Sequence, residues 1–171
     1  TNEIEDRLLA TLPLGLVAIE KIIFASLRAL IASGVMFPVG LWILGGIPWH
    51  NSTAPTAMAV LVLGCLVGSA LGLMLGTLLP ANGVNIMCAG MLAPLLFTGA
   101  SQYPWPSLVH LRWFQVVTAL NPLTYVSEGL RGAMTPQVAH MQPWICLVVL
   151  AGSTLVLSGI GMWGFFRRAL G

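Results

Sequence analysis

Residues 57–79 read AMAVLVLGCLVGSALGLMLGTLL, a run without a single charged side chain. The hydrocarbon core of a bilayer is roughly 30 Å thick, and a helix of about 20 apolar residues crosses it. This run is therefore predicted to be a transmembrane helix. Three more stretches are predicted to cross as well: residues 21–49, 84–102 and 143–166. The sequence thus predicts an all-α integral membrane protein with four transmembrane helices, in which residues 1–171 form a single membrane domain.

The overall composition agrees with this prediction and excludes other classes of protein. Of the 171 residues, 57% are hydrophobic and 7% are charged, whereas a typical soluble domain carries about 25% charged residues. A soluble domain and a disordered chain would both need more charge. The net charge of +2 is too small to indicate a nucleic-acid partner. The cysteines Cys65, Cys88 and Cys146 lie in apolar runs and are interpreted as reduced hydrophobic side chains, and no Cys/His spacing predicts a metal site.

The basic residues predict an orientation in the membrane. With four spans, both ends of the chain lie on one side, which would carry Arg7, Lys21, Arg28, Arg167 and Arg168. The opposite side would carry Arg112 and Arg131. Because Lys and Arg are enriched in cytoplasmic loops, we expect a multi-pass protein of the plasma membrane with both ends in the cytoplasm. Residues 103–142 are then external.

Residues 1–20 form an amphipathic segment at the predicted cytoplasmic face. Asn2 is placed to cap a short helix, and the acidic residues that follow suit the positive end of the helix dipole. A helix of this kind can dock on a soluble partner, and the alternative is a helix that merely rests on the bilayer. The candidate docking residues are Glu3, Glu5, Asp6, Arg7, Leu8, Leu9, Leu12 and Pro13.

Four glycines recur at intervals of four residues in the second predicted span: Gly64, Gly68, Gly72 and Gly76. This spacing places them along one helix face, where the lack of side chains lets another helix approach closely. We therefore predict a tight helix-packing face, whose partner can lie in this chain or in another. The alternative is a chance recurrence in a glycine-rich membrane protein.

Residues 103–142 are too apolar for an ordinary external loop. Residues 108–120 are predicted to form one helix with Ser107 as its cap, and Asn121-Pro122 restarts a second helix, with Asn as cap and Pro at the first position. In this second helix, Glu128 and Arg131 are spaced to form an ion pair, near Tyr125. Two short helices favour a re-entrant hairpin that dips from outside, whose backbone must be buried in protein or line a water-filled cavity. The alternative is an interfacial amphipathic hairpin.

The run NPLTYVSEGLR at residues 121–131 resembles the NPLTY-x-x-E-x-x-R signature of ABC-2 type transporter permeases. Residues 5–21 look like the coupling-helix region of the same family. The resemblance implies six spans in a full permease, so that this chain would lack the first two. It also implies that residues 1–20 dock on an ABC ATPase subunit, and that the permease pairs with a second copy or a homologous permease. Asn121, Pro122, Tyr125, Glu128 and Arg131 would belong to an external gate or hairpin.

Three functions are compatible with this sequence. The first is the permease subunit of an ATP-driven ABC exporter for an amphipathic, drug-like, lipid or lipid-linked cargo. This chain has no G-x-x-x-x-G-K-[ST] loop, so ATP and Mg would be bound by the partner subunit and no cofactor by this chain. The second is a membrane scaffold or assembly protein without transport. The third is a membrane-embedded enzyme, for which His50, His110, His140 and Glu128 are the candidates, although no catalytic motif accompanies them.

Overall fold

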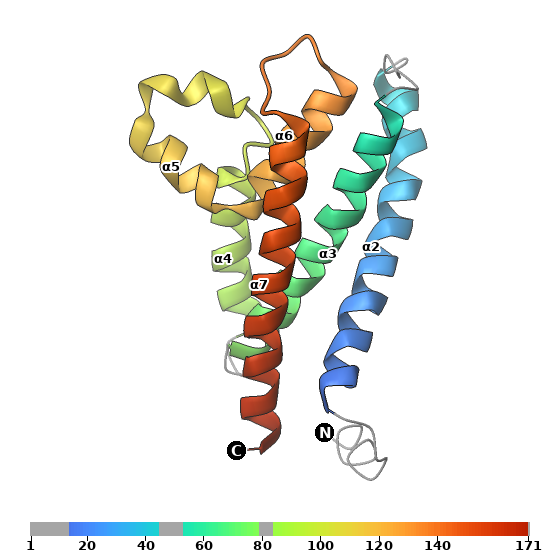
Figure 1. Cartoon of the computed structure of the whole chain (residues 1–171), viewed down its shortest axis with the longest axis vertical. Coiled ribbons are helices and arrows are strands. Elements are labelled where there is room, and N and C mark those ends of the chain that lie inside the picture. The colour runs from blue at the N-terminus through green and yellow to red at the C-terminus, as the bar shows by residue number, and fades with distance from the viewer. Residues whose placement is uncertain (1–13, 45–52, 79–83, 171) are drawn as a thin grey trace.

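The computed structural model describes residues 14–44, 53–78 and 84–170, and every regular element in these ranges is helical (Figure 1). The elements are α2 (Leu14–Leu44), α3 (Ala54–Leu78), α4 (Val84–Thr98), the 3-10 helix η2 (Trp105–His110), α5 (Arg112–Leu120), α6 (Pro122–Met134) and α7 (Pro143–Leu170). The all-α prediction is therefore confirmed for the residues that the structure describes.

Three of these helices are long and apolar enough to cross a membrane: Gly15–Gly40 within α2, Ala54–Leu78 in α3 and Pro143–Arg167 within α7. On α7, Trp144 and Trp163 are 61% and 58% exposed. They lie about 28 Å apart along the axis, at ~1.5 Å per residue. This distance matches the hydrocarbon thickness of roughly 30 Å, and tryptophan is enriched at both membrane interfaces. The chain is thus a multi-pass membrane protein.

The fourth span, predicted over residues 84–102, remains a prediction. Helix α4 has 15 residues and contains Pro94, so its length is about 22 Å, shorter than the hydrocarbon core. The helix ends at Thr98, and the chain then turns through Ala100, whose φ is +51°. Residues 99–102 therefore belong to a turn and not to the helix.

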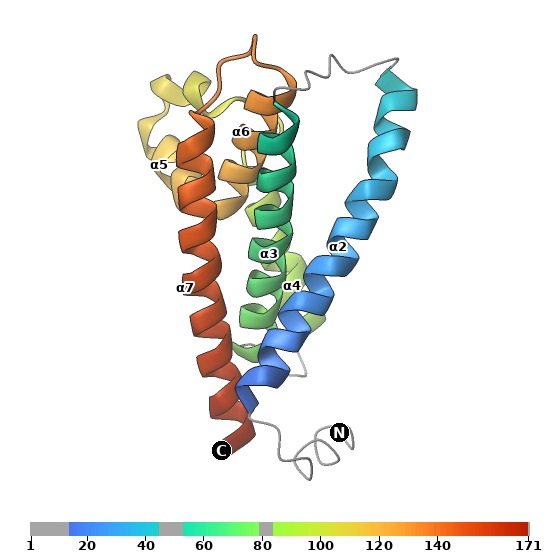
Figure 2. The same cartoon turned by 45° about the vertical axis from the view of Figure 1, so that its right-hand side comes forward.

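Helices α3, α6 and α7 form the best-packed part of the molecule. The buried side chains of Val60, Val67 and Leu150 are at its centre, and α3 makes its most extensive contacts with α7. Helix α2 is tilted against α3, and α5 lies on the side of the bundle away from α2 (Figure 2). The beginning of α2 and the end of α7 lie at the same end of the bundle (Figures 1 and 2).

The single helix predicted over residues 108–120 is wrong. Leu111 leaves the helical conformation at φ −121° and ψ 63°, and it separates η2 from α5. Ser107 does not cap a helix, because it lies inside η2 and its hydroxyl donates to the carbonyl of Pro104 at 2.6 Å. Across the break, the Trp105 indole N–H donates to the carbonyl of Gln115 at 3.2 Å, a contact that a single straight helix over residues 105–115 could not make.

Candidate functional site

Asn121 lies at the junction of α5 and α6, and its side chain caps the start of α6 and the end of α4. Its side-chain oxygen accepts from the backbone N–H of Leu123 at 3.0 Å, so that it is the N-cap of α6, with Pro122 in the first turn. Its amide nitrogen donates to the carbonyl of Leu95 at 2.6 Å and to the hydroxyl of Thr98 at 2.9 Å. The predicted cap of α6 is confirmed, and the same side chain also satisfies the end of α4.

The hydroxyl groups of Thr124 and Tyr125 donate hydrogen bonds to other carbonyl groups at helix ends. The hydroxyl of Thr124, which is buried, donates to the carbonyl of Thr118 at 2.6 Å and lies 3.2 Å from the carbonyl of Thr98. The hydroxyl of Tyr125 donates to the carbonyl of Ala119 at 2.9 Å. The last carbonyls of a helix have no partner within it, and in a membrane such groups must be satisfied by the protein itself. The polar residues of the NPLTY run therefore complete the ends of α4 and α5.

Glu128, in the middle of α6, connects three segments of the chain. Its side chain is 0% exposed. One carboxylate oxygen accepts from the backbone N–H of Trp105 at 2.9 Å, and the other accepts from the backbone N–H of Met141 at 3.0 Å. The first oxygen also accepts from the guanidinium of Arg131, so the ion pair expected from the spacing is present. Arg131 in turn donates to the carbonyl of Ala100 at 3.0 Å.

A buried carboxylate is tolerated when it is paired and its remaining lone pairs accept hydrogen bonds. Glu128 meets both conditions, because it has one cation and two backbone donors. No buried side-chain nitrogen or oxygen among the described residues lacks a hydrogen-bond partner. This arrangement joins the turn after α4, the helix α6 and the segment before α7, and it suits a rigid connection between them.

Two glycines that the sequence analysis did not single out bring α6 close to its neighbours. A Cβ on Gly129 would lie 2.9 Å from a methyl group of Val60, and a Cβ on Gly132 would lie 2.6 Å from the ring of His140. Both distances are too short for a real side chain. The signal was available, because Gly129-x-x-Gly132 is a small-residue pair on one face of the predicted helix.

The glycine face of α3 is only partly in contact with other residues of the chain. A Cβ on Gly64 would lie 3.0 Å from Val126 of α6, whereas one on Gly68, Gly72 or Gly76 would meet no atom of the described residues within 4 Å. Gly68 and Gly72, together with Gly64, line an open groove, whose other walls belong to α2 and α6. Tight packing at the last three glycines stays a prediction, which would require another partner.

The close approach between long helices occurs elsewhere, between α3 and α7. A Cβ on Gly164 would lie 2.8 Å from the hydroxyl oxygen of Thr77, and one on Gly161 would lie 3.2 Å from the backbone nitrogen of Met74. The Thr77 hydroxyl is also 3.4 Å from the carbonyl of Gly161. Sequence reasoning missed this contact, although Gly161-x-x-Gly164 in the last span was a visible signal.

The predicted docking residues Glu3, Glu5, Asp6, Arg7, Leu8, Leu9, Leu12 and Pro13 lie outside the described residues. Of the enzyme candidates, His110 is exposed and His140 has its Nδ1 2.8 Å from the carbonyl of Val138. Within the described ranges, no group of three or more His, Cys, Asp or Glu residues could hold a metal ion.

Comparison with known families adds to this geometry. The sequence model of the family described as ABC-2 type transporter matches residues 5–135. The chain belongs to this family. The matched range covers α2 to α6 and therefore contains both the capped hairpin and the groove beside α3. Neither the comparison with curated proteins nor the comparison with solved structures gave a match.

As an ABC-2 type transporter, the chain is a membrane permease, which is a transport subunit and acts in an ABC transporter system with an ATPase partner. Its signature run now has a physical explanation in this chain. Asn121, Thr124 and Tyr125 satisfy the ends of α4 and α5, and Glu128 with Arg131 joins the segments around α6.

Proposed function

We propose that this permease is the transmembrane subunit of an ATP-driven exporter, which moves an amphipathic, drug-like, lipid or lipid-linked cargo outward across the plasma membrane. ATP and Mg bind to the partner ATPase, and this chain binds no cofactor. The permease acts together with a second copy of itself or with a homologous permease. An apolar cargo path is favoured because the three candidate spans are apolar, with mean hydropathies of 1.9, 2.4 and 2.2.

The hairpin of α5 and α6 is the observation that carries the proposal. Its apex at Asn121 is hydrogen-bonded to α4, and its second helix is held by the buried carboxylate of Glu128. Such backbone is compatible with re-entry into a membrane, since its carbonyl groups at the helix ends are satisfied by side chains of the hairpin itself. In the proposed exporter, this hairpin closes the external end of the cargo path.

The opposite end of the bundle would face the cytoplasm. The first residues of α2 and the last residues of α7 lie together there (Figure 2). Lys21 and Arg167, both exposed, lie near this end, and basic residues favour the cytoplasmic side. Residues 1–20 would then be placed to dock on the ATPase.

Transport is tested with the permease and its ATPase co-expressed and prepared as inverted membrane vesicles. An exporter accumulates cargo inside such vesicles, so we expect ATP-dependent uptake of a fluorescent amphipathic amine or of a fluorescent short-chain phosphatidylcholine. The control replaces ATP with a non-hydrolysable analogue. Accumulation in right-side-out vesicles alone would overturn the direction, and ATPase binding without any uptake of either probe would favour the scaffold function instead.

A further inference from the structure

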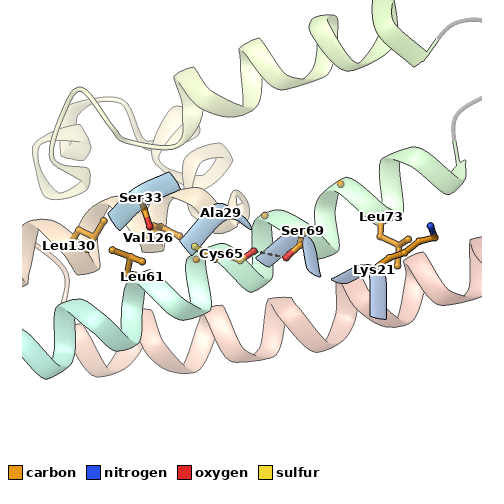
Figure 3. A pocket seen from close by; sticks show the side chains of 13 residues that line it. Lys21, Ala29, Ser33, Leu61, Cys65, Ser69, Leu73, Val126 and Leu130 are labelled. Carbon is orange, nitrogen blue, oxygen red and sulfur yellow. Dashed lines mark hydrogen bonds between the residues drawn. The ribbon is translucent and has the colours of Figure 1, made fainter. Parts of the chain in front are cut away.

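Helices α2, α3 and α6 enclose an open, apolar groove of about 660 Å³ (Figure 3). This volume falls within the roughly 300–1,000 Å³ of ligand pockets in proteins. Two of its walls consist of small residues: Ala25, Ala29 and Ser33 on α2, and Gly64, Gly68 and Gly72 on α3. Neither Glu128 nor Arg131 lines the groove, so its occupant is tested separately from the proposed transport function.

The two small-residue walls do not touch along most of the groove. A Cβ on Gly68 or Gly72 would meet no atom of the described residues within 4 Å, although small residues in a membrane normally let helices pack against one another. The polar groups inside are already satisfied, because the hydroxyl of Ser33 donates to Leu30 at 2.8 Å and that of Ser69 to Cys65 at 2.6 Å. The groove therefore offers apolar contact and no free hydroxyl donor, as a hydrocarbon chain requires.

The length of the groove and the charged residue at one end of it indicate what kind of molecule it binds. Lys21 lies at one end of the groove beside Leu73, and Val126 and Leu130 lie toward the other (Figure 3). Along α2, Lys21 and Ser33 are about 18 Å apart at ~1.5 Å per residue, close to half of the roughly 30 Å hydrocarbon core. Lys21 is the one charged side chain among the described lining residues. One leaflet's acyl chain with an anionic headgroup at Lys21 matches both features.

We propose that this groove binds an acyl chain of an anionic phospholipid, whose phosphate pairs with the ammonium group of Lys21. The bound chain fills the space between the small-residue walls and so completes the packing of α2 against α3. Lys21 is also at the depth expected for a headgroup, because Trp42, near the far end of α2, is about 31 Å away along the helix.

The test is native mass spectrometry of the detergent-purified permease, titrated with dioleoyl-phosphatidylglycerol or dioleoyl-phosphatidylcholine. Gly68→Leu places a side chain in the open groove, so we expect the affinity for phosphatidylglycerol to fall by at least about tenfold. Gly159→Leu is the matched control, because a Cβ there also meets no described atom within 4 Å but the residue does not line the groove.

A second variant tests the charge without altering the packing. Lys21→Gln, at an exposed position, should lower the preference for phosphatidylglycerol over phosphatidylcholine by about fivefold, the effect of one basic residue near an anionic surface. Arg112→Gln, at the exposed start of α5, should leave this preference unchanged. Equal binding by Gly68→Leu and Gly159→Leu, or an unchanged preference in Lys21→Gln, would overturn the proposal. Loss of a permease dimer in Gly68→Leu with the lipid count unchanged would identify a second copy as the occupant and would overturn it too.

Discussion

Replacing Glu128 with alanine removes the carboxylate at the centre of the hydrogen-bonded network around α6. The backbone N–H groups of Trp105 and Met141 lose their acceptor, and Arg131 loses its partner. Each buried donor left without an acceptor costs about 1–3 kcal/mol. The side chain of Arg131 is 15% exposed, so water solvates only a small part of its charge. Breaking a buried pair of this kind costs about 3–5 kcal/mol.

We therefore expect Glu128→Ala to lower the free energy of unfolding by about 3–5 kcal/mol. Glu128→Gln keeps the shape of the side chain but has one acceptor oxygen, so it leaves one backbone donor unsatisfied as well as the charge of Arg131. The double variant Glu128→Gln/Arg131→Gln removes that charge. It should be more stable than Glu128→Gln alone, with a coupling energy of about 0.5–3 kcal/mol.

The measurement is equilibrium unfolding of the purified permease in detergent, followed by tryptophan fluorescence, to which Trp105 beside the pair contributes. Gln137→Ala, at an exposed position between α6 and α7, is the control and should stay within about 0.5 kcal/mol of the unsubstituted protein. A surface ion pair is worth about 0–1 kcal/mol. If Glu128→Ala costs no more than that, the carboxylate is not the buried acceptor described above.

Four further predictions concern other parts of the chain. Asn121→Ala removes three hydrogen bonds and should cost about 2–4 kcal/mol in the same unfolding assay, whereas a loss below 1 kcal/mol would contradict the double cap. Gly64→Leu should reduce the folded yield on size-exclusion chromatography because it collides with α6, while Gly68→Leu should leave the yield unchanged; equal yields would show that α6 does not limit this face. Charge reversal across residues 5–7 should reduce co-purification of the ATPase without reducing the yield of the permease, and undiminished co-purification would refute docking there. A cysteine in place of Ser127 should react with a membrane-impermeant thiol reagent from the outside, and labelling from the cytoplasmic side alone would reverse the proposed topology.

The hairpin illustrates how far local sequence reasoning reaches. Asn121-Pro122 predicted the start of α6 correctly, and the spacing of Glu128 and Arg131 predicted their ion pair. Both are short-range effects within one or two helical turns. The partners of the same residues could not be predicted, because Asn121 bonds to a carbonyl 26 positions away and Arg131 to one 31 positions away.

The glycines give a second comparison. Their spacing on α3 correctly indicated a face without side chains, but spacing does not say which helix, if any, covers that face. In the structure, Gly64 contacts α6, whereas Gly68 and Gly72 line a groove. Among the described glycines of the long helices, Gly164 of α7 leaves the least room for a side chain, because a Cβ there would lie 2.8 Å from the hydroxyl oxygen of Thr77.

By itself, the sequence determined the class of the protein, its three long apolar helices, the start of α6 and its family resemblance. These properties depend on transfer of apolar side chains into lipid and on hydrogen bonds between near neighbours, which act wherever the residues occur. Only the tertiary structure decided that Leu111 would separate η2 from α5, that Glu128 would accept from Trp105 and Met141, and that the small-residue walls of α2 and α3 would stay apart. These features depend on the relative position of segments distant in the chain, which the packing of α3, α6 and α7 sets as a whole.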